Sequence, residues 1–256
     1  MGKTSRDGAP RFREGRKVIS NSVLYRLQAQ AALSFRDTFC PLTETRMFRI
    51  GITPDLEATL MPEILTRVRR ETPGIHLQSK IRGNVDLLAA LDDGSIDVGV
   101  SYIDKTAPWH KTEELYREYH LCCYNPKLLP IRLDRKTYLK TPHALLSKTE
   151  SLLGCLEDIL QSAQVELNVV TSSPNFWTIL STISRTPMLT TLPSKVANRY
   201  APLFGLKVCE NPVKLGSFPC SMVSPARTDL ESGMEWLRGQ LRMAAQRCEI
   251  RPNRKR

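Results

Sequence analysis

Hydroxyl side chains stand at the ends of several short, β-rich stretches of this chain. They are Thr53, Ser101, Ser172 and Thr191. In a parallel sheet, ligands bind outside the edge where the carboxyl ends of the strands meet. We therefore expect these hydroxyls to hydrogen-bond a small molecule, with Tyr102 and His143 flanking it. The competing interpretation is that each hydroxyl only caps a helix or a turn.

Residues that could support catalysis or hold a metal are scattered. The four histidines, His76, His110, His120 and His143, stand far apart, and none has a second ligand at helical or hairpin spacing. Phosphate-binding and zinc-protease patterns such as G-x-x-x-x-G-K-[ST] and H-E-x-x-H do not occur. Asp92 and Asp93 sit beside Gly94 at the end of a predicted helix, where they terminate structure. We expect no enzyme, no cofactor and no metal site.

The seven cysteines also lack a metal-binding or disulfide pattern. Their number is odd, no C-x-x-C occurs, and the adjacent Cys122 and Cys123 point to opposite faces of a predicted strand. No apolar run approaches the roughly 18 residues of a membrane span, and no secretory signal is recognisable at the N-terminus. We expect a cytoplasmic protein with reduced thiols.

The elements that must position the hydroxyls are clearest between Met47 and Tyr102. Three β-rich runs alternate here with two helical patterns, which predicts parallel strands joined by crossover helices. Pro54 suits the first position of a helix, and Pro62 inside the same pattern predicts a kink or a restart of the helix. Asn84 caps the second helix, and Gly94 ends it.

The same alternation of strands and helices returns after residue 124. LYREYHLCCY predicts a strand that leaves the first unit, and PCSMVS predicts one that returns. An α/β fold with two lobes and a hinge between them follows. The expected boundaries are 47–121 with 218–247 for lobe I, 122–217 for lobe II, 1–46 for an N-terminal segment and 248–256 for a basic tail.

The charge of the chain is concentrated at its ends. The formal net charge is +11, but residues 47–241 hold 22 Lys and Arg against 21 Asp and Glu. Residues 1–46 hold nine against four, and residues 242–256 hold six against one. A nearly neutral body argues against direct nucleic-acid binding by the lobes.

Several stretches, in order and spacing, resemble the LysR-type transcriptional regulators. FRIGIT, LMPEILTRVRRETPGIHL and DLLAALDDGSIDVGV are similar to the start of their effector-binding domain. MLTTLPSKVANRYAPLFGLKV and PCSMVSPARTDLESGMEWLRGQL resemble its later part, with Ser224 where the family usually has histidine. The resemblance runs from about Met47 to Leu241. It implies a periplasmic-binding-protein-like fold that binds a small anionic or aromatic co-inducer.

Upstream, the resemblance implies parts of a DNA-binding module. RFREGRKVIS is similar to the end of the family's wing, with Arg13, Arg16 and Lys17 as phosphate contacts, and residues 21–39 resemble its dimerising linker helix. The helix-turn-helix that should precede the wing is missing from the sequence. We expect a dimer or tetramer that meets DNA only where that module is present, and no membrane partner.

Two further hypotheses remain open. A solute-binding protein of the periplasmic type would share the two-lobed fold, although the absent signal and the helix at 21–39 argue against it. A truncated partner that dimerises with intact regulators is the other. Size-exclusion chromatography with and without residues 1–40 separates them, because a solute binder is a monomer in both forms.

Overall fold

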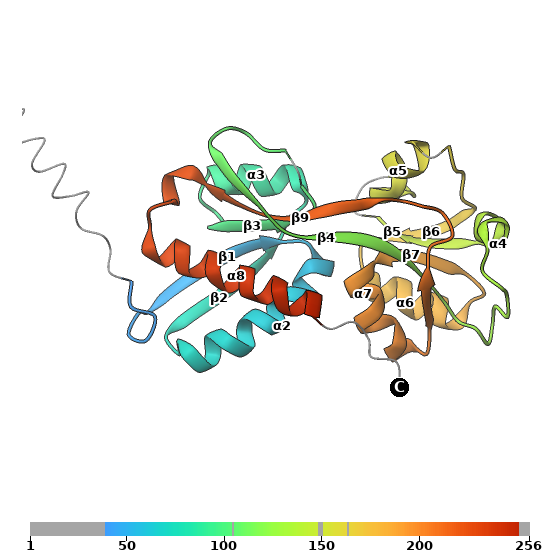
Figure 1. The fold of residues 1–256 in the computed structure, drawn as a ribbon, viewed down its shortest axis with the longest axis horizontal. Helices are drawn as coiled ribbons and strands as arrows, with labels where there is room; N and C mark the ends of the chain where they lie inside the picture. The colour runs from blue at the N-terminus through green and yellow to red at the C-terminus, as the bar shows by residue number, and fades with distance from the viewer. Residues whose placement is uncertain (1–38, 104, 148–150, 163, 251–256) are drawn as a thin grey trace, which may run out of the picture. The chain divides into compact units, whose positions relative to one another are not determined.

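The structure is a computed structural model that describes residues 39–103, 105–147, 151–162 and 164–250 (Figure 1). The predicted wing segment and linker helix, with Arg13, Arg16 and Lys17, lie outside the described residues. The helices and strands are β1 (Arg46–Ile52), α2 (Pro54–Glu71), β2 (Ile75–Ile81), α3 (Asn84–Asp92), β3 (Val98–Ser101), β4 (His110–Tyr124), α4 (Arg135–Lys140), β5 (His143–Leu146), η1 (Gly154–Leu156), α5 (Glu157–Ser162), β6 (Val169–Ser173), α6 (Phe176–Arg185), β7 (Leu189–Pro193), α7 (Ser194–Tyr200), η2 (Ala201–Phe204), β8 (Lys207–Glu210), β9 (Ser217–Pro225), η3 (Ala226–Thr228) and α8 (Ser232–Ile250).

The strands of the described chain follow the order β2-β1-β3-β9-β4-β7-β5-β6, and β8 pairs with β4. β1 is parallel to β2 and β3, and β5 is parallel to β6 and β7, as strands joined by helices should be. β9 runs antiparallel to both β3 and β4, while β4 continues into pairs with β7 and β8. The predicted two-lobed α/β fold is confirmed.

Helices cover both faces of the first parallel group. α2 and α8 pack on one face with Phe48, Ile50 and Met222, and α3 packs on the other with Ile96 and Val223 (Figure 1). α2 begins at Pro54 with acidic side chains in its first turn and ends with Arg69 and Arg70, which suits the helix dipole at both ends. Pro62 lies inside this helix, which continues through it without a restart.

The second parallel group also has two packed faces. α6 and α7 cover one face with Leu180, Leu192 and Val196, and α4 and α5 cover the other with Tyr138 and Leu160. α6 begins where the Asn175 side chain accepts a hydrogen bond from the Trp177 N–H at 2.9 Å. These layers hold β7, and therefore the start of α7, against β4.

Some element boundaries differ from those predicted. β4 begins at His110 instead of Leu115, because its first residues pair with the end of β9. Between β5 and β6, the helical segment consists of the 3-10 turn η1 followed by the short α5. α4 was not predicted; it begins with a capping box in which Asp134 and Thr137 bond each other's backbone N–H groups.

Candidate functional site

The two strands that connect the lobes carry a row of buried side chains on one face. Tyr116, Glu118 and His120 alternate along β4 with exposed residues, and Phe218 and Cys220 lie opposite Glu118 and Tyr116 on β9. We call these five residues the crossover face. Side chains in a strand alternate between faces, so the pairing register alone brings the five together.

His120 is the least satisfied polar group of the crossover face. Its side chain is buried, with 6% of the residue exposed, and neither ring nitrogen has a hydrogen-bond partner. The ring lies 4.6 Å from that of Phe218, centroid to centroid. Burial lowers the pKa of His120 to about 4, so the imidazole is neutral near pH 7. A neutral imidazole offers one donor and one acceptor.

Glu118, by contrast, has several hydrogen-bond donors on one of its two carboxylate oxygens. One carboxylate oxygen accepts hydrogen bonds from the N–H and the hydroxyl of Ser194 and from the Tyr119 N–H. The Lys195 ammonium lies 3.9 Å from its other oxygen and 3.9 Å from the centroid of the Tyr116 ring. These contacts join the start of α7 to β4, and they leave Glu118 and Lys195 committed to each other.

The start of α2 approaches the crossover face from lobe I. Burial raises the pKa of Tyr102, and the negative charges of Asp55 and Glu118 raise it further. The Tyr102 ring also contacts Phe218 edge to face at 5.0 Å. Thr53, two residues before Asp55, is 3% exposed, and its hydroxyl has no hydrogen-bond partner.

The structure separates the six side chains that the sequence grouped at one site. Tyr102 contacts Phe218 of the crossover face, and Thr53 stands between the end of β1 and the start of α2. Ser101 donates a hydrogen bond to Asn84, whose amide bonds the Tyr102 carbonyl at 3.2 Å. Thr191 and His143 come together elsewhere, around Tyr138. Ser172 lies on β6, separated from β4 by β5 and β7.

Thr191 and His143 both bond to Tyr138. The Thr191 hydroxyl lies 2.8 Å from the phenol oxygen, and His143 Nε2 donates to the Tyr138 carbonyl at 2.7 Å. Burial lowers the pKa of His143, and its contact with the carbonyl partly opposes this. Both side chains therefore make hydrogen bonds within lobe II. The role of Thr191 and His143 as effector contacts stays a prediction.

Sequence reasoning missed His120, Glu118, Phe218 and Lys195. A usable signal was present, because Tyr116, Glu118 and His120 follow a two-residue period in a stretch identified as a crossing strand. The pairing of that stretch with residues about 100 positions later was not readable from local pattern.

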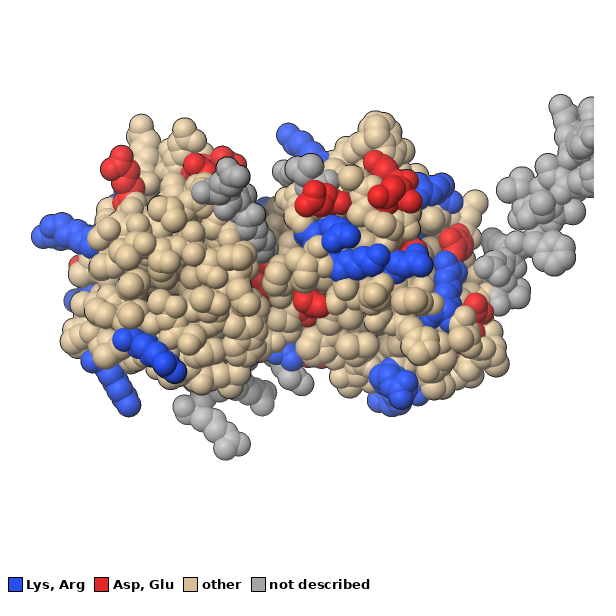
Figure 2. All heavy atoms as spheres, turned by 180° about the vertical axis from the view of Figure 1, so that it is seen from behind, with Lys and Arg blue, Asp and Glu red and all other residues tan. Residues whose placement is uncertain are grey.

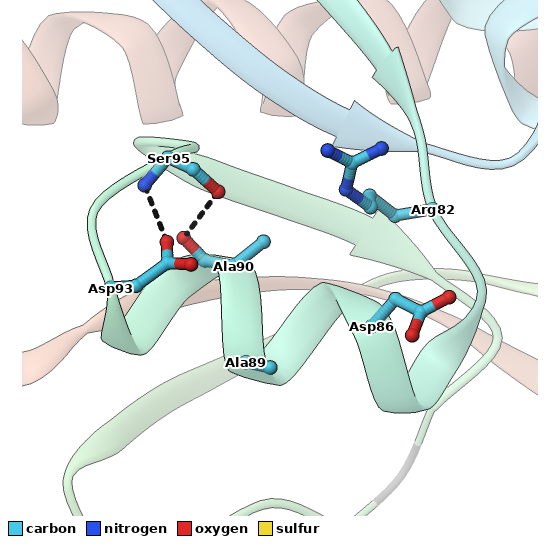
Figure 3. A pocket seen from close by; sticks show the side chains of 6 residues that line it. All are labelled: Arg82, Asp86, Ala89, Ala90, Asp93 and Ser95. Carbon is cyan, nitrogen blue, oxygen red and sulfur yellow. Dashed lines mark hydrogen bonds between the residues drawn. The ribbon is translucent and has the colours of Figure 1, made fainter.

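A shallow surface pocket of about 300 Å³ lies away from the crossover face, beside α3 (Figure 3). Its polar side chains largely serve the helix end: Asp93 accepts from the Ser95 N–H at 2.7 Å, and the Ser95 hydroxyl bonds the Ala90 carbonyl at 3.3 Å. Neither bond points to a ligand. Among the residues placed by the structure, no three His, Cys, Asp or Glu side chains gather as metal ligands.

Charged side chains of both signs lie on one face of the described body. Figure 2 shows Lys and Arg side chains interspersed with Asp and Glu on the face it presents. Within the described part of the chain, no helix has both the length and the apolar character needed to cross a membrane.

Known proteins are similar to this chain in sequence and in fold. Residues 43–246 match the model of the LysR substrate binding domain. The chain is 23% identical over 224 residues to the HTH-type transcriptional activator NagR of Ralstonia sp, covering 86% of this chain and 74% of NagR. It is 25% identical over 206 residues to Nodulation protein D 3 of Rhizobium leguminosarum bv. phaseoli, covering 79% and 68%.

Solved structures agree with these sequence matches. The regulatory domain of MexT, a transcriptional activator in Pseudomonas aeruginosa, superposes with a TM-score of 0.71 at 28% identity, covering 79% of this chain and 99% of that one. Full-length BenM superposes with a TM-score of 0.63 at 16% identity, covering 92% and 78%, and at that identity the likeness concerns the fold.

Proposed function

The chain belongs to the LysR substrate-binding-domain family and is an effector-sensing regulatory domain, and from this premise we propose that its effector binds against the crossover face, with His120 as the main polar contact. The observation that carries the proposal is the pair of unpartnered nitrogens on a buried ring. A buried polar group without a partner costs about 1–3 kcal/mol, which a ligand that bonds it would recover. Thr53 and Tyr102 are the predicted residues that belong to this site.

The groups left free at the crossover face favour an uncharged ligand. They are the neutral imidazole of His120, the hydroxyl of Thr53 and the rings of Tyr102 and Phe218. An anion would meet the carboxyl groups of Asp55 and Glu118, while the nearby ammonium of Lys195 is already directed at Glu118. We therefore narrow the anionic or aromatic co-inducer expected from the sequence to a flat, uncharged molecule with a hydroxyl or carbonyl group.

Regulation would follow from a shift between lobe arrangements. A ligand that binds one lobe arrangement more tightly than the other raises the population of that arrangement. The size of the shift is set by the difference between the two affinities. Regulators of this family bind effectors, form oligomers and bind DNA, and full-length CbnR was solved with its target DNA. We propose that this chain likewise works in an oligomer, where the arrangement of its lobes affects contacts with DNA. Arg13, Arg16 and Lys17 remain the proposed phosphate contacts.

A thermal-shift screen with charge-matched pairs of compounds tests this function. Pairs such as 4-hydroxybenzamide and 4-hydroxybenzoate differ mainly in charge, and we expect stabilisation from the neutral members. For a compound that binds, His120→Phe should weaken affinity about tenfold, because a hydrogen bond worth about 1.4 kcal/mol is lost while ring size is kept.

The matched control is His76→Phe, which changes an exposed histidine on β2 and should leave affinity unchanged. Equal binding of hits to wild type and His120→Phe would contradict the assignment of His120. Stabilisation by the carboxylates alone would contradict the ligand class.

A further inference from the structure

In helix α2, one backbone carbonyl lacks the usual hydrogen bond from the N–H group four residues later. Residue 62 is proline, which has no N–H and therefore cannot donate to the carbonyl of Ala58, four residues earlier. Inside a helix, a proline ring also crowds the carbonyl four residues earlier. Ala58 packs against the core of α6 and α7 in lobe II, so its free carbonyl faces the other lobe.

A tyrosine from lobe II supplies the missing donor. The hydroxyl of Tyr200, the last residue of α7, donates to the Ala58 carbonyl. Burial raises the pKa of Tyr200, which keeps the phenol protonated and able to donate. The bond joins residues 142 positions apart, on helices packed in different lobes.

Neighbouring contacts strengthen the same junction. Arg199 donates to the carbonyl of Thr59 at 3.2 Å and lies 3.5 Å from the Glu63 carboxylate. We call Ala58, Thr59 and Glu63 on α2, together with Arg199 and Tyr200 on α7, the interlobe clasp. The ion pair is partly exposed and contributes little, so the partly buried hydrogen bond from Tyr200 to the Ala58 carbonyl is the distinctive part.

We infer that Tyr200 is a positioning residue that holds the two lobes in this arrangement, by serving the carbonyl that Pro62 leaves free. If α7 separates from α2, the Ala58 carbonyl loses the hydrogen bond from Tyr200. Residue 62 has no backbone N–H that could replace this donor. The clasp therefore favours the lobe arrangement in which α2 and α7 touch. Its influence on effector response rests on the function proposed above, whereas the clasp itself can be tested without any effector.

A double-mutant cycle separates this role from ordinary packing. Tyr200→Phe removes the hydroxyl and should lower the Tm by about 2–4 °C, the shift expected when a protein of this size loses a hydrogen bond. Pro62→Ala restores a backbone donor to Ala58, so in that background Tyr200→Phe should lower the Tm by less than about half as much. The matched control is Pro54→Ala, because Pro54 begins α2 and restores no helical bond.

Hydrogen exchange of the full-length variants gives a second readout. Tyr200→Phe, a change in lobe II, should speed amide exchange in the lobe I peptide that contains residues 54–62, and Pro62→Ala should restore slow exchange in the double variant. A cycle in which the two substitutions add, with no change in that peptide, would overturn the clasp. The result is independent of the ligand screen, so failure of one proposal is distinguishable from failure of the other.

Once a ligand is known, the same variants show what the clasp controls. The affinity of Tyr200→Phe for a hit such as 4-hydroxybenzamide should differ from wild type by severalfold, and the difference should shrink in the Pro62→Ala background. Equal affinities in all four variants would show that the clasp and the ligand are not coupled, and would overturn its link to sensing.

Discussion

His120 combines burial, neutrality and an incomplete set of hydrogen bonds in a single side chain. Its neighbour Glu118 is also buried, but one of its carboxylate oxygens is hydrogen-bonded, and the partly buried Lys195 lies 3.9 Å from the other oxygen. This contrast supports the proposal that His120, rather than a charged residue, contacts the ligand. The burial of His120 also makes the stability of the protein depend on the protonation of its imidazole.

We predict that acid destabilises the fold through His120. The imidazole has a pKa of about 4 when folded and about 6.5 as an unperturbed group, so the unfolded chain binds more protons between these values. Stability should therefore fall as pH drops from about 6.5 to 4, by up to about 3 kcal/mol from this group. His143, whose pKa burial also lowers, adds a change of the same sign.

Urea unfolding across this pH range checks the prediction. The free energy of unfolding of His120→Phe should depend less on pH than that of wild type. His76→Phe, at an exposed position, should follow the wild-type curve. Parallel curves for His120→Phe and wild type would show that His120 does not titrate as the structure predicts.

At the level of elements, two glycines on neighbouring strands leave room for side chains that pack beneath α3. Gly51 on β1 and Gly99 on β3 are paired in register. A Cβ on Gly99 would lie 2.7 Å from Leu87 Cδ2, and one on Gly51 would lie 2.4 Å from Ile96 Cδ1. The absence of side chains at these positions thus sets how near α3 packs to β1 and β3.

Gly99→Ala should therefore destabilise the protein by about 1–3 kcal/mol, because the new methyl group overlaps Leu87. Leu87→Ala makes room, so the double variant should be more stable than the sum of the two single effects predicts. Chemical denaturation measures all three. Gly83→Ala, where a Cβ meets nothing within 4 Å, is the control and should change stability little. Simple additivity would argue against the close contact.

For the molecule as a whole, β4 and β9 tie the lobes into one structure. β4 pairs with β9 over residues 110–119 and with β7 and β8 over residues 120–124. The clasp adds a second junction through α2 and α7. Loss of either lobe would therefore strip pairing partners from a strand that the other lobe needs.

We predict that both lobes unfold in a single transition. Ile64→Ala in the core of lobe I and Ile183→Ala in the core of lobe II should each cost about 2–5 kcal/mol. Each substitution should lower the midpoint of one common transition. Near-UV circular dichroism and hydrogen exchange in both lobes measure this transition. Two separate transitions, each moved by only one substitution, would contradict this coupling.

The sequence by itself determined the local elements and the family. Pro54 and Gly94 mark helix ends through backbone chemistry that acts within a few residues, and alternating strands and helices predict parallel pairing. The prediction that Asn84 caps α3 was wrong, because Gly83 is the N-cap residue and the Asn84 side chain accepts a hydrogen bond from Ser101 instead. The ordered motifs from Met47 to Leu241 predicted the LysR resemblance, which the family match over residues 43–246 confirms. The two-lobed fold needed no further information.

Only the tertiary structure decided which side chains meet. Thr191 and His143 bond to Tyr138, while His120 meets Phe218 and Tyr200 meets Ala58. These contacts depend on the register of strands far apart in the chain and on the packing of helices over them, and local periodicity carries neither. A hydroxyl at a strand end was thus predictable, but its partner was not, because the partner is set by long-range packing.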